Sequence, residues 1–143
     1  MSRIELDTKA KCACGSVDVS VTGPTLSMLL CSCRDCRKAT GTGHSAVVVM
    51  PRKAVVVTGA VTGFTRTANS GSALTRHFCP VCGTPIFATT ERAPTITLLP
   101  AGLFDEPDWF KPNQLIFARS HLEWDTLAEN LPHHETYRDP NGF

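Results

Sequence analysis

Seven cysteines in three short groups constrain this chain of 143 residues more than any other feature of its sequence. Their number is odd, so complete pairing into disulfides would leave one thiol over. The N-terminus shows no continuous hydrophobic segment of the kind that directs secretion, so we expect a cytoplasmic location. In that reducing compartment, grouped thiols are metal ligands or catalytic groups more often than disulfides. The groups are Cys12 and Cys14, then Cys31, Cys33 and Cys36, then Cys79 and Cys82.

The pair Cys79 and Cys82 is typical of a metal-binding turn, because a C-x-x-C spacing points two sulfurs at one tetrahedral ion. Gly83 permits the positive φ that such a turn requires. Cys12 and Cys14, also followed by glycine, are the natural second pair. We call these four residues the four-cysteine set and predict that they form a closed structural zinc site, which has no position for substrate. The alternative is a redox dithiol, but such a pair usually begins a helix in an α/β context, and the sequence indicates none.

The run Cys31, Cys33 and Cys36, which we call the three-cysteine set, predicts a second zinc site of a different kind. Three protein ligands plus an open fourth position are the arrangement of catalytic zinc. Three thiolates leave zinc with a formal charge near −1, which suits it to holding or activating a thiol. Two alternatives stay open: His44 or His77 closes the site as a fourth ligand, or the thiols bind no metal. His77 stands just before the last cysteine pair, so we expect it to pack near the first site instead.

Alternation with period two predicts a mainly β fold. In residues 16–22, Val17, Val19 and Val21 fall on one face and polar side chains on the other. Further short, β-branched segments are separated by Gly, Pro, Asn or Ser, as in an all-β sheet or sandwich. Besides 16–22, strands are predicted at 26–30, 44–50, 54–58, 61–67, 74–78, 85–89, 95–99 and 115–118, and helices at 34–40 and 123–130.

The length of the chain and the lack of a long linker predict one globular domain over residues 1–143, which we divide into a core at about 11–132 and an irregular tail at 133–143. Hydrophobic residues make up 42% and charged residues 19%, which excludes a disordered chain. The net charge is +1, from 14 basic and 13 acidic side chains, so we expect no nucleic-acid partner and no membrane partner. No apolar run reaches the ~18–20 residues of a membrane span.

The cysteine groups and their surroundings resemble the family of glutathione-dependent formaldehyde-activating enzymes, also called the centromere-protein-V/GFA domain family. The resemblance covers nearly the whole chain, from about Lys11 to about Pro132. It rests on Cys-Ala-Cys-Gly at 12–15, Cys-Ser-Cys-Arg-Asp-Cys-Arg-Lys at 31–38, Phe-Cys-Pro-Val-Cys-Gly-Thr at 78–84, Ala-Gly-Leu-Phe-Asp-Glu-Pro at 101–107, and Ile-Phe at 116–117 with Ser120 and Trp124.

This resemblance implies a β-tent (Mss4-like) fold of twisted antiparallel sheets around zinc-binding knuckles. It implies a structural zinc on the four-cysteine set and a catalytic zinc on the three-cysteine set, hence two zinc ions per chain. The implied activity is that of a zinc-dependent carbon–sulfur lyase acting on a thiol–aldehyde adduct such as S-hydroxymethylglutathione or a related small thiol conjugate. Many members carry His where this chain has Ser32, so a neighbouring ring donor is absent here.

On the enzyme interpretation, several further residues receive a role. His44 is the candidate general acid that protonates the alkoxide. Arg34, Arg37 and Lys38 could attract the carboxylates of a glutathione-like substrate, or else they are solvated charges on a short helix.

Two other functions are weighed against this one. The first is a non-catalytic, zinc-stabilised β-tent scaffold that binds a protein partner, which a closed second site would favour. The second is methionine sulfoxide reduction, which needs a catalytic cysteine late in the chain, whereas no cysteine follows Cys82. A homodimer is left open as the oligomeric state.

Overall fold

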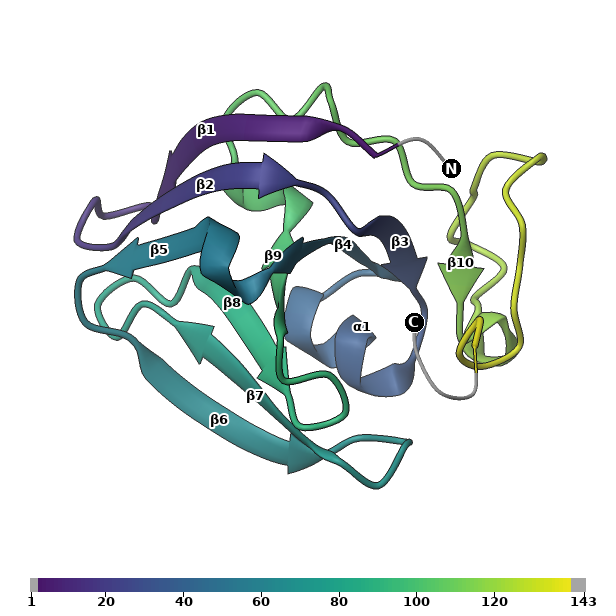
Figure 1. The fold of residues 1–143 in the computed structure, drawn as a ribbon. Coiled ribbons are helices and arrows are strands. Elements are labelled where there is room, and N and C mark those ends of the chain that lie inside the picture. The colour runs from purple at the N-terminus through teal and green to yellow at the C-terminus, as the bar shows by residue number, and fades with distance from the viewer. Residues whose placement is uncertain (1–2, 140–143) are drawn as a thin grey trace.

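The computed structural model describes residues 3–139 and confirms the mainly β prediction. Over these residues the chain forms ten strands, one α-helix and three short 3-10 helices. Figure 1 shows the strands together with the single α-helix, α1. The 3-10 helices are η1 (Arg52–Ala54), η2 (Ala101–Leu103) and η3 (Ala118–Ser120). Between residues 3 and 139, the chain contains no helix with the length and apolar character that a bilayer crossing requires.

The smaller sheet has three antiparallel strands. In sheet order they are β1 (Glu5–Lys11), β2 (Asp18–Pro24) and β5 (Val55–Thr58). In β2 the predicted alternation is confirmed, because Val19 and Val21 are buried while the residues between and beside them are partly or fully exposed. The sequence does not predict β1, since only Leu6 and Ala10 of its seven residues are buried. That strand is held by pairing with β2 along its whole length.

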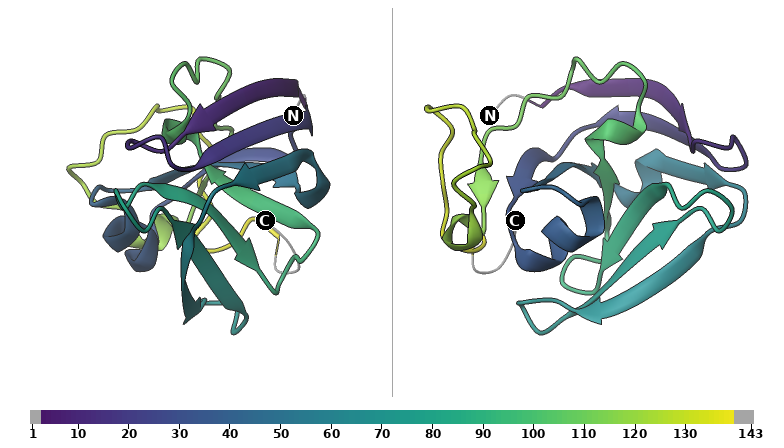
Figure 2. Two further views of the ribbon diagram at one scale, coloured as in Figure 1. Left: turned by 90° about the vertical axis from the view of Figure 1, so that its left-hand side faces the viewer. Right: turned by 180° about the vertical axis from the view of Figure 1, so that it is seen from behind.

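The larger sheet has seven strands, all antiparallel except that β10 runs parallel to β3. In sheet order they are β10 (Leu115–Ile116), β3 (Ser27–Cys31), β4 (Ser45–Pro51), β9 (Ile96–Pro100), β8 (Pro85–Thr90), β7 (Ala73–Phe78) and β6 (Thr62–Thr67). Helix α1 (Arg34–Thr40) connects β3 to β4 and lies beside this sheet in both the front and the back view (Figures 1 and 2). Every strand predicted from the sequence is present, with ends displaced by two residues or fewer.

Strand β4 separates two hydrophobic clusters, because its side chains alternate between the two faces of the sheet. Val48 and Met50 pack into the main core, together with the valines of β2 in the smaller sheet. Val49 points the other way, into a smaller cluster that contains Phe117 and two members of the three-cysteine set. The three-cysteine set therefore lies on the face of the larger sheet that is turned away from the main core.

Of the two predicted helices, one is confirmed and one is wrong. Helix α1 occupies the predicted residues, with Cys33 as N-cap accepting a backbone N–H at 3.3 Å and Gly41 ending it at a φ of 74°. Residues 123–130 instead form turns and irregular chain. A helix there has no apolar stripe to bury: Trp124 is 66% exposed, whereas the polar Asp125 is buried.

The predicted irregular tail is described as far as residue 139, and residues 140–143 lie outside the described part. From 133 to 139 it makes a single bridge to β10 and no regular element. Its Tyr137 packs edge-on against Phe117, with ring centroids 4.9 Å apart. The tail therefore lies against the smaller hydrophobic cluster, close to the three-cysteine set.

Candidate metal centres and the adjoining cleft

The structure gathers the sulfurs of the four-cysteine set, although its two pairs are far apart in the sequence. All four Sγ atoms lie within 4.8 Å of one another. Cys14 Sγ is 3.6 Å from Cys12 Sγ and 3.7 Å from Cys79 Sγ. Four thiolates placed tetrahedrally around zinc at about 2.3 Å would be about 3.8 Å apart. The spacing therefore fits a zinc ion.

Each cysteine pair of this set lies in a turn that directs backbone N–H groups at sulfur. The Val17 N–H donates to Cys12 Sγ at 3.3 Å, and Cys79 Sγ receives two N–H groups at 3.4 and 3.5 Å. The turns contain Gly15 and Gly83, whose φ angles are +80° and +77°. Hydrogen bonds to sulfur favour the thiolate, which is the form that binds a metal.

Two hydroxyl groups reinforce the same effect. Ser16 Oγ lies 3.0 Å from Cys14 Sγ. Thr84 Oγ1 lies 3.2 Å from Cys82 Sγ, and hydrogen bonds, of which this one contributes most, lower the pKa of Cys82 to about 5. Thr84 Oγ1 also accepts the backbone N–H of Ala13 at 3.1 Å, which ties the two turns together. Each of the two pairs thus has a hydroxyl group beside one of its sulfurs.

The three-cysteine set forms at the junction of β3 and α1. Cys31 ends the strand, Cys33 caps the helix and Cys36 lies in its first turn, with Sγ atoms within 4.8 Å of one another. The adjacent thiols of Cys33 and Cys36 raise the pKa of Cys31. Hydrogen bonds from Cys31 and Cys36 lower the pKa of Cys33 to about 2. Three thiolates this close need a cation between them, and soft thiolate ligands suit zinc.

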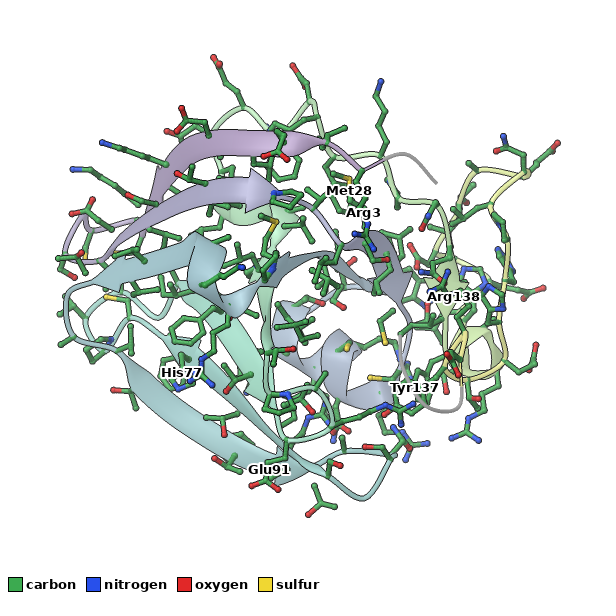
Figure 3. The ribbon with its side chains drawn as sticks, in the orientation of Figure 1. Arg3, Met28, His77, Glu91, Tyr137 and Arg138 are labelled. Atoms are coloured by element: carbon green, nitrogen blue, oxygen red, sulfur yellow. The ribbon has the colours of Figure 1, made fainter. Side chains whose placement is uncertain are left out.

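Neither candidate histidine joins this group. His44 Nδ1 lies 2.7 Å from Asp125 Oδ2, and within 3–139 the group contains no ligand atom besides the three sulfurs. His77 stacks on Phe87 with ring centroids 4.2 Å apart, and burial lowers its pKa. Figure 3 shows His77 on the opposite side of the molecule from Tyr137. Among the described residues, the three-cysteine set therefore leaves a fourth coordination position free of protein ligands.

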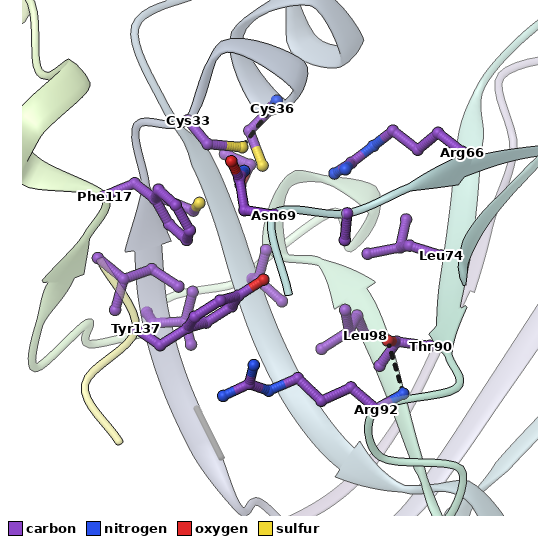
Figure 4. A pocket seen from close by; sticks show the side chains of 16 residues that line it. Cys33, Cys36, Arg66, Asn69, Leu74, Thr90, Arg92, Leu98, Phe117 and Tyr137 are labelled. Carbon is purple, nitrogen blue, oxygen red and sulfur yellow. Dashed lines mark hydrogen bonds between the residues drawn. The ribbon is translucent and has the colours of Figure 1, made fainter. Parts of the chain in front are cut away.

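A small cavity of about 80 Å³ opens beside the three-cysteine set. Figure 4 shows the guanidinium of Arg66, from β6, extending toward Cys36 and Asn69. The guanidinium of Arg92 lies over the Tyr137 ring, 3.9 Å from its centroid. These side chains come from β6, from the turns after β6 and β8, and from the tail, so no local motif could have indicated them.

A larger cleft of about 650 Å³ adjoins the cavity and shares Cys36, Ser45 and Arg66 with it. It is lined by α1, by strands β4, β6, β7, β8 and β9, and by His44. A volume of this size is typical of small-molecule sites. The cavity beside the three-cysteine set therefore continues into a space that can hold the body of a ligand.

The cleft carries an excess of positive charge. Lys38, Arg66 and Arg76 line it, and Asp35 is the one acidic residue among the lining residues that the structure describes. Arg66 pairs with Asp35 at 3.1 Å. Of the three helix cations singled out in the sequence, only Lys38 belongs to the described walls of the cleft or the cavity.

The fold and the two cysteine sets define a mainly β protein with two candidate metal centres. The chain belongs to the family described as glutathione-dependent formaldehyde-activating enzyme, whose sequence model matches residues 7–120. Two fungal relatives are named, provisionally, for the same enzyme. One, from Fusarium vanettenii, is 26% identical over 118 residues, and one from Penicillium rubens is 28% identical over 120 residues. Each match covers 80% of this chain but only 63% and 62% of the relatives' own lengths.

A solved structure shares the fold. It is the crystal structure of a Rhodobacter sphaeroides protein, a Northeast Structural Genomics target, with a TM-score of 0.56 and 19% sequence identity. The match covers 68% of this chain and 88% of that chain. At this identity the likeness concerns the fold alone.

Ser32, which stands where many family members carry His, faces away from the open side of the three-cysteine set. Its exposure is 0%, and it lines neither the cavity nor the cleft. Its N–H donates to the Ile116 carbonyl at 3.1 Å, while its hydroxyl has no hydrogen-bond partner among the described residues. The exchange therefore alters the buried side of the cysteine set rather than the wall that faces a ligand.

Proposed function

We propose that the four-cysteine set holds a structural zinc, that the three-cysteine set holds a catalytic zinc, and that the protein makes and breaks the carbon–sulfur bond of thiol–aldehyde adducts. One observation carries this proposal. The three-cysteine set opens into a cavity and a cleft, whereas the four-cysteine set is complete with its own ligands. Membership of the family supports a glutathione-related substrate.

The chemistry needs an ionised thiol and a proton donor. Zinc on the three-cysteine set would supply positive charge that lowers the pKa of a substrate thiol. The thiol proton passes to solvent, and solvent returns a proton to the His44 ring after turnover. In the direction of synthesis, the thiolate sulfur bonds to the carbonyl carbon, the C=O π electrons move to oxygen, and that oxygen takes a proton from His44. In the direction of cleavage, His44 takes the hydroxyl proton as the carbon–sulfur bond breaks. The cavity walls hold the two reactants in contact, which by itself contributes to the rate.

Charge in the cleft favours a thiol that carries carboxylates. Lys38, Arg66 and Arg76 line the cleft next to the cavity, and only Arg66 has an acidic partner among the described lining residues. Arg binds carboxylates in a bidentate manner, and Lys binds them as a point charge. Glutathione has two carboxylates, so its body would lie along these cations while its sulfur reaches the three-cysteine set.

The test compares Cys33→Ala with Ser32→Ala, a neighbouring change that touches neither cavity. Zinc per chain is measured by mass spectrometry, and the formation of S-hydroxymethylglutathione from glutathione and formaldehyde is measured by NMR. Wild type and Ser32→Ala should hold two zinc ions and be active. Cys33→Ala should hold one zinc and lose activity.

Three results would contradict the proposal. If Cys33→Ala loses one zinc and stays fully active, the three-cysteine set is not catalytic. If it loses both ions, the three-cysteine set is needed for folding. A wild type with two ions but no activity toward any thiol–aldehyde adduct would favour the scaffold function instead.

A further inference from the structure

A buried carboxylate stands behind His44, a residue that lines the cleft, in the segment after the last 3-10 helix. The Asp125 side chain is only 10% exposed. Buried carboxylates are rare unless a partner compensates for their loss of hydration. The Asp125 N–H donates to the Leu122 carbonyl at 3.0 Å, and this turn directs the carboxylate into the protein.

The partner of this carboxylate is the ring of His44. Asp125 Oδ2 lies 2.7 Å from His44 Nδ1, across 81 positions of sequence. The residue before His44 is Gly43, and a Cβ at that position would lie 2.4 Å from Asp125 Cγ. The carboxylate is therefore packed directly against the backbone that carries the histidine.

We propose that Asp125 is the positioning residue that sets the tautomer and orientation of His44, which rests on the proposed role of His44 in the carbon–sulfur chemistry. A carboxylate at Nδ1 holds the neutral ring with its proton on that nitrogen. Because Nδ1 faces Asp125 and the His44 ring lines the cleft, Nε2 is the nitrogen available to a substrate oxygen.

The proton balance follows from this arrangement. When the adduct forms, the Nε2 proton of the imidazolium moves to the alkoxide oxygen, and the neutral ring with a proton on Nδ1 remains. When the adduct is cleaved, Nε2 takes the hydroxyl proton, and Asp125 stabilises the imidazolium that results. The Nδ1 proton stays between the ring and the carboxylate throughout.

A second histidine supports Asp125 without replacing His44. His121 Nε2 lies 2.7 Å from the backbone carbonyl of Asp125 and 3.9 Å from its Oδ2. His121 therefore binds the main chain of the turn and leaves the closer carboxylate contact to His44. The turn is thus held from both sides, which keeps the carboxylate in place.

The first test needs no substrate. In the zinc-loaded full chain, long-range ¹⁵N–¹H correlation spectra of the histidine rings, assigned with His44→Gln, report which nitrogen carries the proton. We expect wild-type His44 in its neutral form to be protonated on Nδ1, and Asp125→Asn to change that pattern. A wild-type His44 protonated on Nε2 would overturn the proposal, even if Asp125→Asn failed to fold.

The second test uses turnover of the glutathione–formaldehyde adduct. Asp125→Asn should lower kcat by about 10²-fold or more, in the range of general acid–base effects, with KM changed less than about threefold. Adding it to His44→Gln should cause no further loss, because both changes remove one function. The exposed Asp105→Asn is the matched control and should leave kcat unchanged.

The outcomes separate this inference from the proposed function. An inactive wild type whose His44 carries its proton on Nδ1 would contradict the function while supporting the role of Asp125 in setting the tautomer. An active wild type in which Asp125→Asn keeps full kcat and the same tautomer would contradict the inference alone. A merely structural role would lower the melting temperature of Asp125→Asn without changing the tautomer, and this result would also overturn it.

Discussion

Replacing Gly43 with alanine should destabilise the protein, because Asp125 occupies the space that the new methyl group requires. A Cβ at position 43 would lie 2.4 Å from Asp125 Cγ and 2.6 Å from Asp125 Cβ. The Asp125 Cβ is bonded to the backbone, and its carboxylate is held by His44 at 2.7 Å, so the side chain cannot simply swing away. Either the loop or the buried pair must move.

The size of the effect follows from the cost of overpacking, which is about 1–3 kcal/mol. An unfolding entropy of about 2.1 cal/mol/K per residue amounts to roughly 0.3 kcal/mol/K for a chain of this length. The melting temperature of Gly43→Ala should therefore fall by about 3–10 °C. Gly102→Ala is the matched control, because a Cβ there would meet nothing within 4 Å and its φ is not positive. We expect it to change stability by less than about 0.5 kcal/mol.

The assay is thermal unfolding followed by circular dichroism, with the zinc content of each variant measured beforehand. That control matters because bound metal shifts the transition by mass action. If Gly43→Ala and Gly102→Ala have the same melting temperature at equal zinc content, Asp125 does not pack against position 43, and the geometry of the histidine–carboxylate pair is wrong.

Three further predictions concern the core, the four-cysteine set and the cleft. Val21→Ala, at a side chain with 0% exposure, should lower the free energy of unfolding in urea by about 2–3 kcal/mol. Val56→Ala, at 60% exposure, should lower it by less than about 0.5 kcal/mol. Equal losses for the two variants would contradict the assigned core. Hydrogen bonds, with that from the Thr84 hydroxyl foremost, lower the pKa of Cys82 to about 5, so protons compete with the metal for this ligand only as the pH falls toward that value. Thr84→Val should raise this pKa and release the metal of the four-cysteine set at a higher pH than wild type or Thr84→Ser, as followed by a zinc indicator; identical release curves would refute the role of the hydroxyl. Arg66→Gln should raise KM about tenfold for the glutathione adduct but not for the adduct of an uncharged thiol, and an equal rise for both would argue against carboxylate binding.

Local spacing in the sequence was enough to predict the three short groups of cysteines. A C-x-x-C or C-x-C spacing places neighbouring sulfurs on one side of a turn, and a following glycine, such as Gly15 or Gly83, allows the positive φ that the turn needs. Alternation likewise predicted β2, because one face of that strand is buried and the other is not. Gly41, a normal helix stop, predicted where α1 ends. Each of these features depends on residues within a few positions of one another.

The walls of the candidate site were decided only by the tertiary structure. Arg66 and Tyr137 meet at the cavity because of the order of strands in the larger sheet and the path of the tail, and neither is encoded by a local pattern. The buried Asp125 lies in a segment whose sequence predicts a helix, yet its pairing with His44 holds it as a turn. Contacts across such sequence separations depend on how whole strands pack, since alternation tells which face of a strand is buried but not which strand will lie beside it. The cysteines could therefore be grouped from the sequence, whereas the cleft, its cations and the carboxylate behind His44 required the fold.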